Sequence, residues 1–263
     1  MNEKKDANDN PASRLYSILS RAKATNAGIV SEGYAQVFGL DAKDFGQLLR
    51  KLGLMSGEAD KVARILKELG ETRPHELYLE SLPYIKKNFE IVHFAQQWQQ
   101  FKGPNFRDVD LKTLLFCADR LSQRRPEKTL ASEVLQKLLD GVTELYEEVS
   151  EADVEQELKA VLLDQLQKIR QAINDYAVRG IDGLREAAAD ALLTAIGNRA
   201  SLQHEAERFR QQRESPYENT NEKFKNPILD YNSFIVTLAT TVQWGTDITP
   251  RIERRLKLFL PSE

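Results

Sequence analysis

The sequence has few of the side chains on which enzyme chemistry usually depends. It contains one cysteine, Cys117, and three widely separated histidines, His75, His93 and His204, in 263 residues. A single cysteine excludes an intramolecular disulfide and a thiolate metal cluster within one chain. No HExxH pattern, glycine-rich phosphate loop or GxSxG elbow occurs. We therefore predict no catalytic residue, no metal ligand and no cofactor, and we identify no small-molecule ligand.

An excess of charge of one sign is also lacking. The formal net charge is -3, so the chain has no surplus of cations to neutralise phosphates, and general nucleic-acid binding is disfavoured. Acidic pairs such as Glu147-Glu148 are typical of solvated helix faces, although carboxylates could also bind a divalent metal. The first ten residues, MNEKKDANDN, lack the apolar stretch of a secretory signal, and we expect a cytoplasmic protein.

Apolar residues recur mainly as stripes at helical spacing. Hydrophobic residues make up 41% of the chain and charged residues 29%, which is typical of helical proteins, and we predict an all-α fold. The expected organisation is a disordered N-terminus (1–10), a helical N-terminal subdomain (11–125), a long-helix bundle (127–212), a linker (213–226) and an apolar and basic C-terminal tail (227–263).

Several local signals place helix boundaries. Asn10-Pro11 predicts a helix start, because asparagine caps well and proline suits the first helical position. Pro83 predicts an interruption of the aromatic-rich segment into two helical pieces, and Pro126 predicts a subdomain boundary. Beyond it, the apolar stripes over 130–149 and 154–176 predict two long helices that fold back as an antiparallel hairpin.

The stretch DYAVRGIDGLREAAA, residues 175–189, predicts a corner between two helices. Gly180 suits a left-handed position that ends one helix, and Asp182 suits the cap of the next. An alternative is an anion site at an exposed helix N-terminus, which Asp182 and Glu186 would oppose by filling it internally. The residues of this candidate anion or interaction site are Arg179, Gly180, Gly183 and Arg185.

The tail contains FIVTLATTVQW, residues 234–244, an apolar and β-branched run. The run fits a buried helix, a strand or a membrane-seeking segment, but it is about half the length that spans a bilayer, roughly 20 residues. Residues 250–260 form a basic amphipathic end that could touch an anionic membrane surface or pack on the protein itself. The candidate partner or membrane contacts are Phe234, Ile235, Leu238, Trp244, Arg251, Arg254 and Arg255.

Three segments carry a resemblance to a known family. NPASRLYSIL (10–19), FCADRLS (116–122) and IRQAINDYAVRGIDGLREA (169–187) resemble segments of a family of uncharacterised bacterial all-helical proteins. The resemblance covers about residues 8–197 and implies a shared helical body in a bacterial protein, with no activity to transfer. The residues after Asn198 fall outside it.

The sequence favours a non-enzymatic helical protein–protein interaction module. The expected partner is another protein or a second copy of the chain, and the C-terminal tail is expected to engage its own body, a subunit or that partner. One alternative is a membrane-active effector of a bacterial conflict or phage-defence system, whose tail contacts the bilayer. A second alternative is a helical hydrolase with a carboxylate-bound metal.

Overall fold

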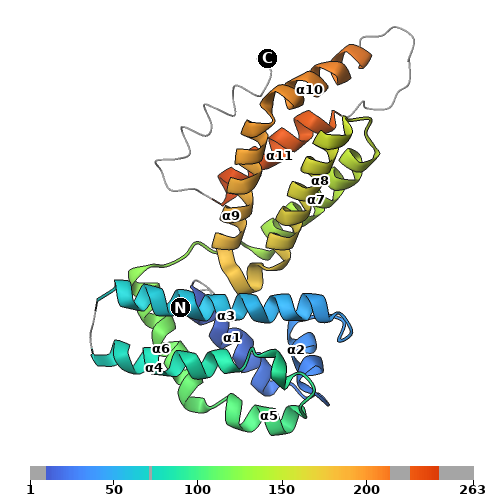
Figure 1. Cartoon of the computed structure of the whole chain (residues 1–263). Helices are drawn as coiled ribbons and strands as arrows, with labels where there is room; N and C mark the ends of the chain where they lie inside the picture. The colour runs from blue at the N-terminus through green and yellow to red at the C-terminus, as the bar shows by residue number, and fades with distance from the viewer. Residues whose placement is uncertain (1–9, 71–72, 214–225, 243–263) are drawn as a thin grey trace. The chain divides into compact units, whose positions relative to one another are not determined.

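The computed structural model describes residues 10–70, 73–213 and 226–242 (Figure 1). Within these ranges the chain forms eleven α-helices, one short 3-10 helix and no β-strand, which confirms the predicted all-α fold. The elements are α1 (Pro11–Ala24), α2 (Val30–Phe38), α3 (Phe45–Glu68), α4 (Arg73–Lys87), the 3-10 helix η1 (Ile91–His93), α5 (Trp98–Asn105), α6 (Asp108–Arg124), α7 (Ser132–Glu151), α8 (Gln156–Asn174), α9 (Tyr176–Gly197), α10 (Arg199–Arg213) and α11 (Pro227–Thr241).

The chain divides into two compact units. Unit 1 comprises Met1–Thr129 and Asp175–Gly180, and unit 2 comprises Leu130–Asn174 and Ile181–Glu263. The boundary near residue 129 lies close to the one expected at Pro126. Residues 175–180 differ from the expectation, because they belong to unit 1 although the sequence places them between two helices of unit 2.

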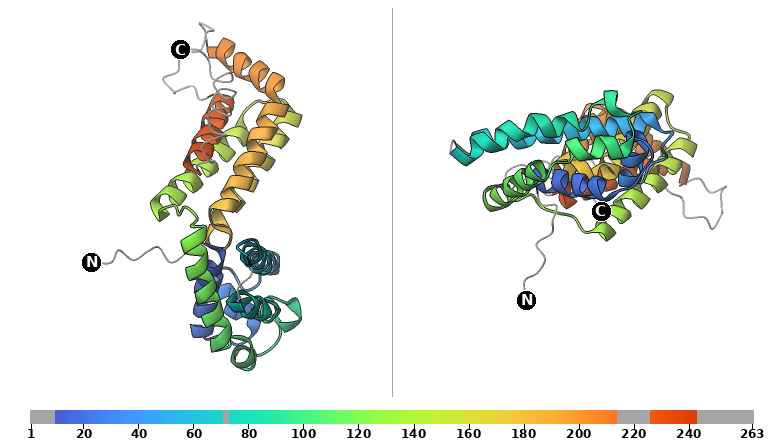
Figure 2. Two further views of the ribbon diagram at one scale, coloured as in Figure 1. Left: turned by 90° about the vertical axis from the view of Figure 1, so that its left-hand side faces the viewer. Right: turned by 90° about the horizontal axis from the view of Figure 1, so that it is seen from below.

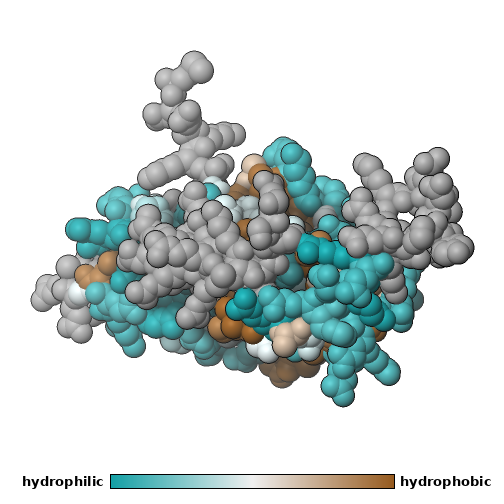
Figure 3. All heavy atoms as spheres, turned by 90° about the horizontal axis from the view of Figure 1, so that it is seen from above, coloured by the Kyte–Doolittle hydropathy of each residue, from teal (hydrophilic) through white to brown (hydrophobic). Residues whose placement is uncertain are grey.

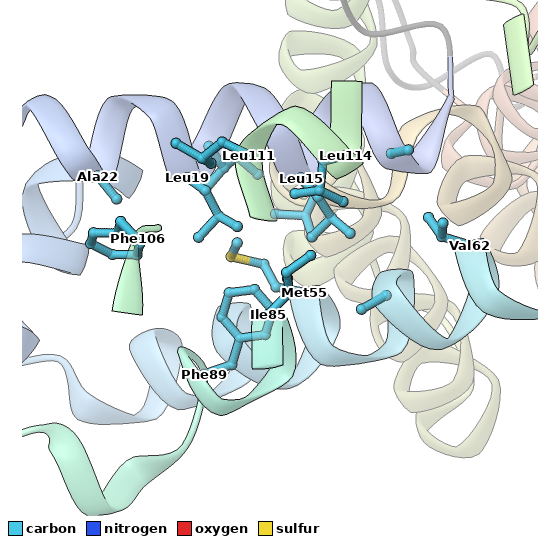
Figure 4. Close-up of a cluster of buried hydrophobic side chains, with 14 of the residues drawn as sticks. Leu15, Leu19, Ala22, Met55, Val62, Ile85, Phe89, Phe106, Leu111 and Leu114 are labelled. Atoms are coloured by element: carbon cyan, nitrogen blue, oxygen red, sulfur yellow. The ribbon is translucent and has the colours of Figure 1, made fainter. Parts of the chain in front are cut away.

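Unit 1 is built on α1, which packs against α3 and α6. The helix begins as predicted: the Asn10 side chain accepts a hydrogen bond from the Ser13 amide at 3.0 Å, and Pro11 occupies the first turn. Leu15 and Leu19 of α1 meet Met55 of α3 in the core shown in Figure 4. Burial of such side chains is the main source of stability for a helical unit of this kind.

The aromatic residues of unit 1 form a second part of this core. Trp98, Tyr34 and Phe106 are almost fully buried and meet mainly edge to face. The Trp98 indole donates a hydrogen bond to the Thr25 carbonyl at 2.9 Å, and the Tyr34 hydroxyl donates to the Asn88 carbonyl at 2.8 Å. Both polar tips are therefore satisfied, and these rings serve packing.

The predicted break at Pro83 is wrong. Helix α4 runs through Pro83, which is exposed, while its neighbours Leu82 and Ile85 are buried against the core. A proline removes one N–H and costs about 3 kcal/mol, and the burial of the neighbouring apolar side chains offsets this cost. The chain leaves the helical path later, between Lys87 and Trp98, where η1 lies.

Unit 2 contains the predicted helical hairpin. Helices α7 and α8 pack along each other and are joined by a short link, as Figure 1 shows. The predicted apolar stripes face inward, and the buried members include Leu138, Val142, Leu145, Leu162 and Leu166.

Most of the apolar run of the tail lies in helix α11, so the run is helical and not a strand. Residues 227–241 are helical, with the Asn226 side chain accepting hydrogen bonds from the Ile228 and Leu229 amides. Figure 2 shows α11 beside α7, against which it packs, and it also packs against α10. Of the run 234–244, Trp244 lies outside the described residues, as does most of the expected linker.

Candidate functional site

The predicted corner at Gly180 is a break inside α9. Gly180 has φ 60° and ψ −152°, so the helix is interrupted there. The positive φ agrees with the prediction, whereas the ψ value is extended and not that of a left-handed helical residue. An L side chain rarely adopts this conformation, and glycine is therefore required on backbone grounds alone.

The side chain packed against this corner is Arg14, which is 2% exposed. Its Nε donates to the Val178 carbonyl at 2.9 Å, and its Nη2 donates to the Arg179 carbonyl at 3.3 Å. A Cβ at residue 180 would collide with the Arg14 guanidinium. The corner is thus shaped around a buried cation.

Two carboxylates neutralise Arg14. Nη2 lies 2.8 Å from Glu58 Oε2 and Nη1 lies 2.6 Å from Glu127 Oε2, while Lys61 Nζ lies 3.0 Å from the other oxygen of Glu127. Burial acts to lower the pKa of Arg14, but Glu127 and Glu58 outweigh it and the pKa lies above its ordinary value. Burial raises the pKa of Glu58, an effect that Arg14 and Lys61 oppose.

A second buried ion pair anchors the same segment. Asp175 is fully buried and pairs with Arg50 and with Lys51 Nζ, which lies 2.9 Å from Oδ1. Buried ion pairs contribute little net stability, but removal of one partner is costly because it leaves the other charge buried. We call Arg14, Glu58, Glu127 and Asp175 the charge cluster of unit 1.

Sequence reasoning missed the charge cluster. The signal was present: Arg14, Ile18 and Ala22 follow one another at intervals of four on α1, so the arginine occupies a core-facing position. A charged residue at such a position needs a buried partner. The sequence alone does not identify that partner.

The four residues of the candidate anion site fall in both units. Arg179 and Gly180 belong to unit 1, and Gly183 and Arg185 belong to unit 2. Arg185 Nη1 lies 3.1 Å from Asp182 Oδ1, and its Nε donates to the Val242 carbonyl at 3.3 Å. Asp182 is one of the two acids that oppose an anion on sequence grounds, and in the structure it forms an ion pair with Arg185.

The candidate contacts of the tail differ in accessibility. Ile235 and Leu238 are almost fully buried within unit 2, so these side chains are part of its core. Phe234 is half-buried. Arg251, Arg254 and Arg255, like Trp244, lie outside the described residues.

Phe234 lines a surface groove between α7 and α11. The groove has a volume of about 320 Å³, and its lining residues are Gly141, Glu144, Leu145, Glu148, Asp230 and Phe234. The Phe234 ring lies directly over the backbone of α7, since a Cβ on Gly141 would be 3.2 Å from Phe234 Cε2. The groove therefore combines an apolar floor with three carboxylates, and we call it the α7–α11 groove.

Exposed apolar side chains gather along the line where α4 meets α6. The Tyr78 and Phe116 rings stack at 6.3 Å, and the Arg107 guanidinium lies 4.6 Å from the Tyr84 ring. Val109 and Phe116, each 57% exposed, lie two turns apart on α6 and therefore on the same side of that helix. We call Tyr78, Tyr84, Val109 and Phe116 the α4–α6 face.

Cys117 and His93, two side chains with catalytic potential, pack against other residues of unit 1. Cys117 is fully buried, and burial raises the pKa of its thiol to about 12. The His93 ring lies 5.1 Å from that of Phe101. Across residues 10–70, 73–213 and 226–242, the structure shows no cluster of three or more histidine, cysteine or acidic residues arranged to hold a metal ion.

Membrane contact was one possibility for the tail. Among the helices that the structure describes, none combines the length and the apolar character needed to cross a bilayer. In Figure 3, the atoms that are coloured by hydropathy are mostly hydrophilic, with smaller hydrophobic areas among them.

Comparison of the chain with protein-family models, with curated proteins and with solved structures gives no match. The resemblance to bacterial all-helical proteins, drawn from three segments of the sequence, stays a prediction.

Proposed function

We propose that this chain is a non-enzymatic helical module for protein–protein interaction, and that the α4–α6 face binds the partner. The observation that carries the proposal is the alignment of exposed apolar side chains along two packed helices of unit 1. Single exposed apolar residues are ordinary on protein surfaces, but a contiguous row of them is typical of an interaction site.

The contacts within the face define its geometry. Tyr78 of α4 meets Phe116 of α6, whereas Tyr84, later in α4, meets Arg107, which precedes α6. The two helices therefore run antiparallel, and Val109 and Phe116 lie on the same side of α6, two turns apart. Two antiparallel helices that present apolar side chains at two-turn spacing suit a third helix.

The chemistry of the face also indicates the kind of partner. Tyrosine, phenylalanine and arginine are the residues enriched at the centres of protein interfaces, because they combine a large apolar area with a polar group. The expected partner is a protein that presents an amphipathic helix with a row of apolar side chains, either on another polypeptide or on a second copy of the chain.

The test compares the native chain with a Val109→Ser/Phe116→Ser double variant. Affinity purification identifies the partner, and binding of the purified partner is then measured by titration, with light scattering used to detect self-association. We expect the double variant to bind at least tenfold more weakly, because it removes the two most exposed apolar side chains of the face.

The matched control is Leu193→Ser on α9, a leucine that is 68% exposed in unit 2. It removes an exposed apolar side chain from another surface and should leave binding unchanged. Thermal unfolding of each variant checks that unit 1 stays folded. Equal partner affinity and equal self-association for the native chain and the double variant would refute the proposal.

A further inference from the structure

The α7–α11 groove differs from the α4–α6 face in charge. Its carboxylates come from both helices: Glu144 and Glu148 from α7, and Asp230 from α11. They surround the half-buried ring of Phe234 and the buried side chain of Leu145. A ligand that fits this surface has cationic groups on apolar stems, as arginine and lysine do.

The chain itself carries such a segment beyond the end of α11. Residues 250–260 contain four cations, Arg251, Arg254, Arg255 and Lys257, against a single acid, Glu253. Ile252, Leu256 and Leu258 alternate with them. The charge of this segment is therefore opposite to that of the groove, and its apolar residues match the apolar floor.

The connection is long enough for the segment to reach the groove. Along α11 the distance from Val242 back to Asp230 is about 18 Å, at about 1.5 Å per helical residue. The chain from Val242 to Arg251 can span up to about 30 Å when extended. A segment tethered in this way has a high effective concentration at the groove, which favours its binding over that of a separate peptide.

We propose that the α7–α11 groove is the docking site for the chain's own basic segment, residues 250–260. The chemistry of the two partners matches, because carboxylates such as Glu144 and Glu148 attract guanidinium groups and the Phe234 ring suits their apolar stems. This docking extends the proposed interaction function, because it identifies the α7–α11 groove as the surface of the same chain that the C-terminal tail binds. It does not depend on the α4–α6 face.

A spin label on residue 262 of the full-length chain tests the docking. Ser262→Cys provides the attachment site, and the native thiol does not compete because Cys117 is fully buried with its pKa raised to about 12. We expect the label to broaden the amide signals of residues 141–148 and 230–234. The broadening should decrease at about 1 M salt, where charges are screened beyond about 3 Å.

Charge reversal makes the test specific. Glu144→Lys/Glu148→Lys should abolish the broadening, and the further changes Arg254→Glu/Arg255→Glu should restore it. The matched control is Glu133→Lys/Glu147→Lys, which makes the same change of charge at exposed positions of α7 that do not line the groove. This control should leave the broadening in place.

Three results with the labelled chain alone would overturn the proposal. They are the absence of broadening in the native sequence, broadening that persists in Glu144→Lys/Glu148→Lys, and a reversed-charge tail that fails to restore it. Broadening in a mixture of labelled and isotope-enriched unlabelled chains would assign the groove to a second copy, which also contradicts docking within one chain. The experiment needs no partner, so its failure is distinguishable from failure of the α4–α6 face.

Discussion

At the scale of single residues, Arg14 and Gly180 depend on each other. The guanidinium fills the space that a side chain at residue 180 would need, and it donates to carbonyls of the two residues before Gly180. Glu58 and Glu127 supply the negative charge that makes burial of Arg14 tolerable. A glycine that looks like a simple helix terminator is thus part of a buried electrostatic arrangement.

Gly180→Ala should destabilise the chain by about 2 kcal/mol or more, because alanine is strained at this φ and its methyl group would displace Arg14. Chemical denaturation measures the free energy of unfolding. Gly53→Ala is the control, since Gly53 lies within α3 with no atom near its missing Cβ, and it should stabilise the chain by about 0.5–1 kcal/mol. Similar effects of the two changes would contradict this account of the corner.

At the scale of elements, α11 is an amphipathic helix with a covered side and an open side. Ile228, Tyr231, Ile235 and Leu238 are buried, whereas Thr237 and Thr240 are exposed. The β-branched run that suggested several structures from sequence is helical because these four buried side chains recur at intervals of three and four positions, which places them on one face of a helix. The buried face of α11 therefore belongs to the core of unit 2.

Ile235→Ala should lower the free energy of unfolding of unit 2 by about 2–5 kcal/mol, because it leaves a cavity beneath α11. Denaturant unfolding followed by circular dichroism gives the measurement. Thr237→Ala, two positions away on the exposed side, should change stability by less than about 0.5 kcal/mol. If the isoleucine change were as mild as the threonine change, α11 would not be packed as the structure shows.

At the scale of the whole molecule, unit 1 is discontinuous in sequence. Its main body ends at Thr129, and residues 175–180 return to it after α7 and α8. This returning segment supplies Asp175 to Arg50 and Lys51, and it supplies the Val178 carbonyl to Arg14. Unit 1 can therefore fold completely only after residues 175–180 have been synthesised.

A fragment of residues 1–129 should be less stable than the same residues in the full chain, because Arg14 and Lys51 lose buried partners. Hydrogen exchange of the α1 and α3 amides compares the two. Asp175→Asn in the full chain tests the same contact without removing residues and should reduce protection in α3. Equal protection in fragment, variant and native chain would show that the returning segment contributes nothing to unit 1.

The helices and many of their boundaries were predictable from the sequence. The cap at Asn10, the stripes of α7 and α8 and the positive φ of Gly180 all follow from interactions between residues a few positions apart. The break expected at Pro83 was wrong because burial of neighbouring side chains opposed a local preference. Local patterns are reliable where no tertiary contact competes with them.

The candidate surfaces were less predictable. Phe234 was identified from sequence, but the carboxylates of α7 that line the groove with it were not, since they lie about ninety positions away along the chain. The partners of Arg14 could not be predicted either, because they are also distant in sequence: Val178 is 164 positions from Arg14. By itself the sequence determined where helices form and which of their faces are apolar, since those properties depend on near neighbours. Only the tertiary structure decided which charges pair, which apolar faces are covered and to which unit residues 175–180 belong, because those outcomes depend on contacts between distant segments.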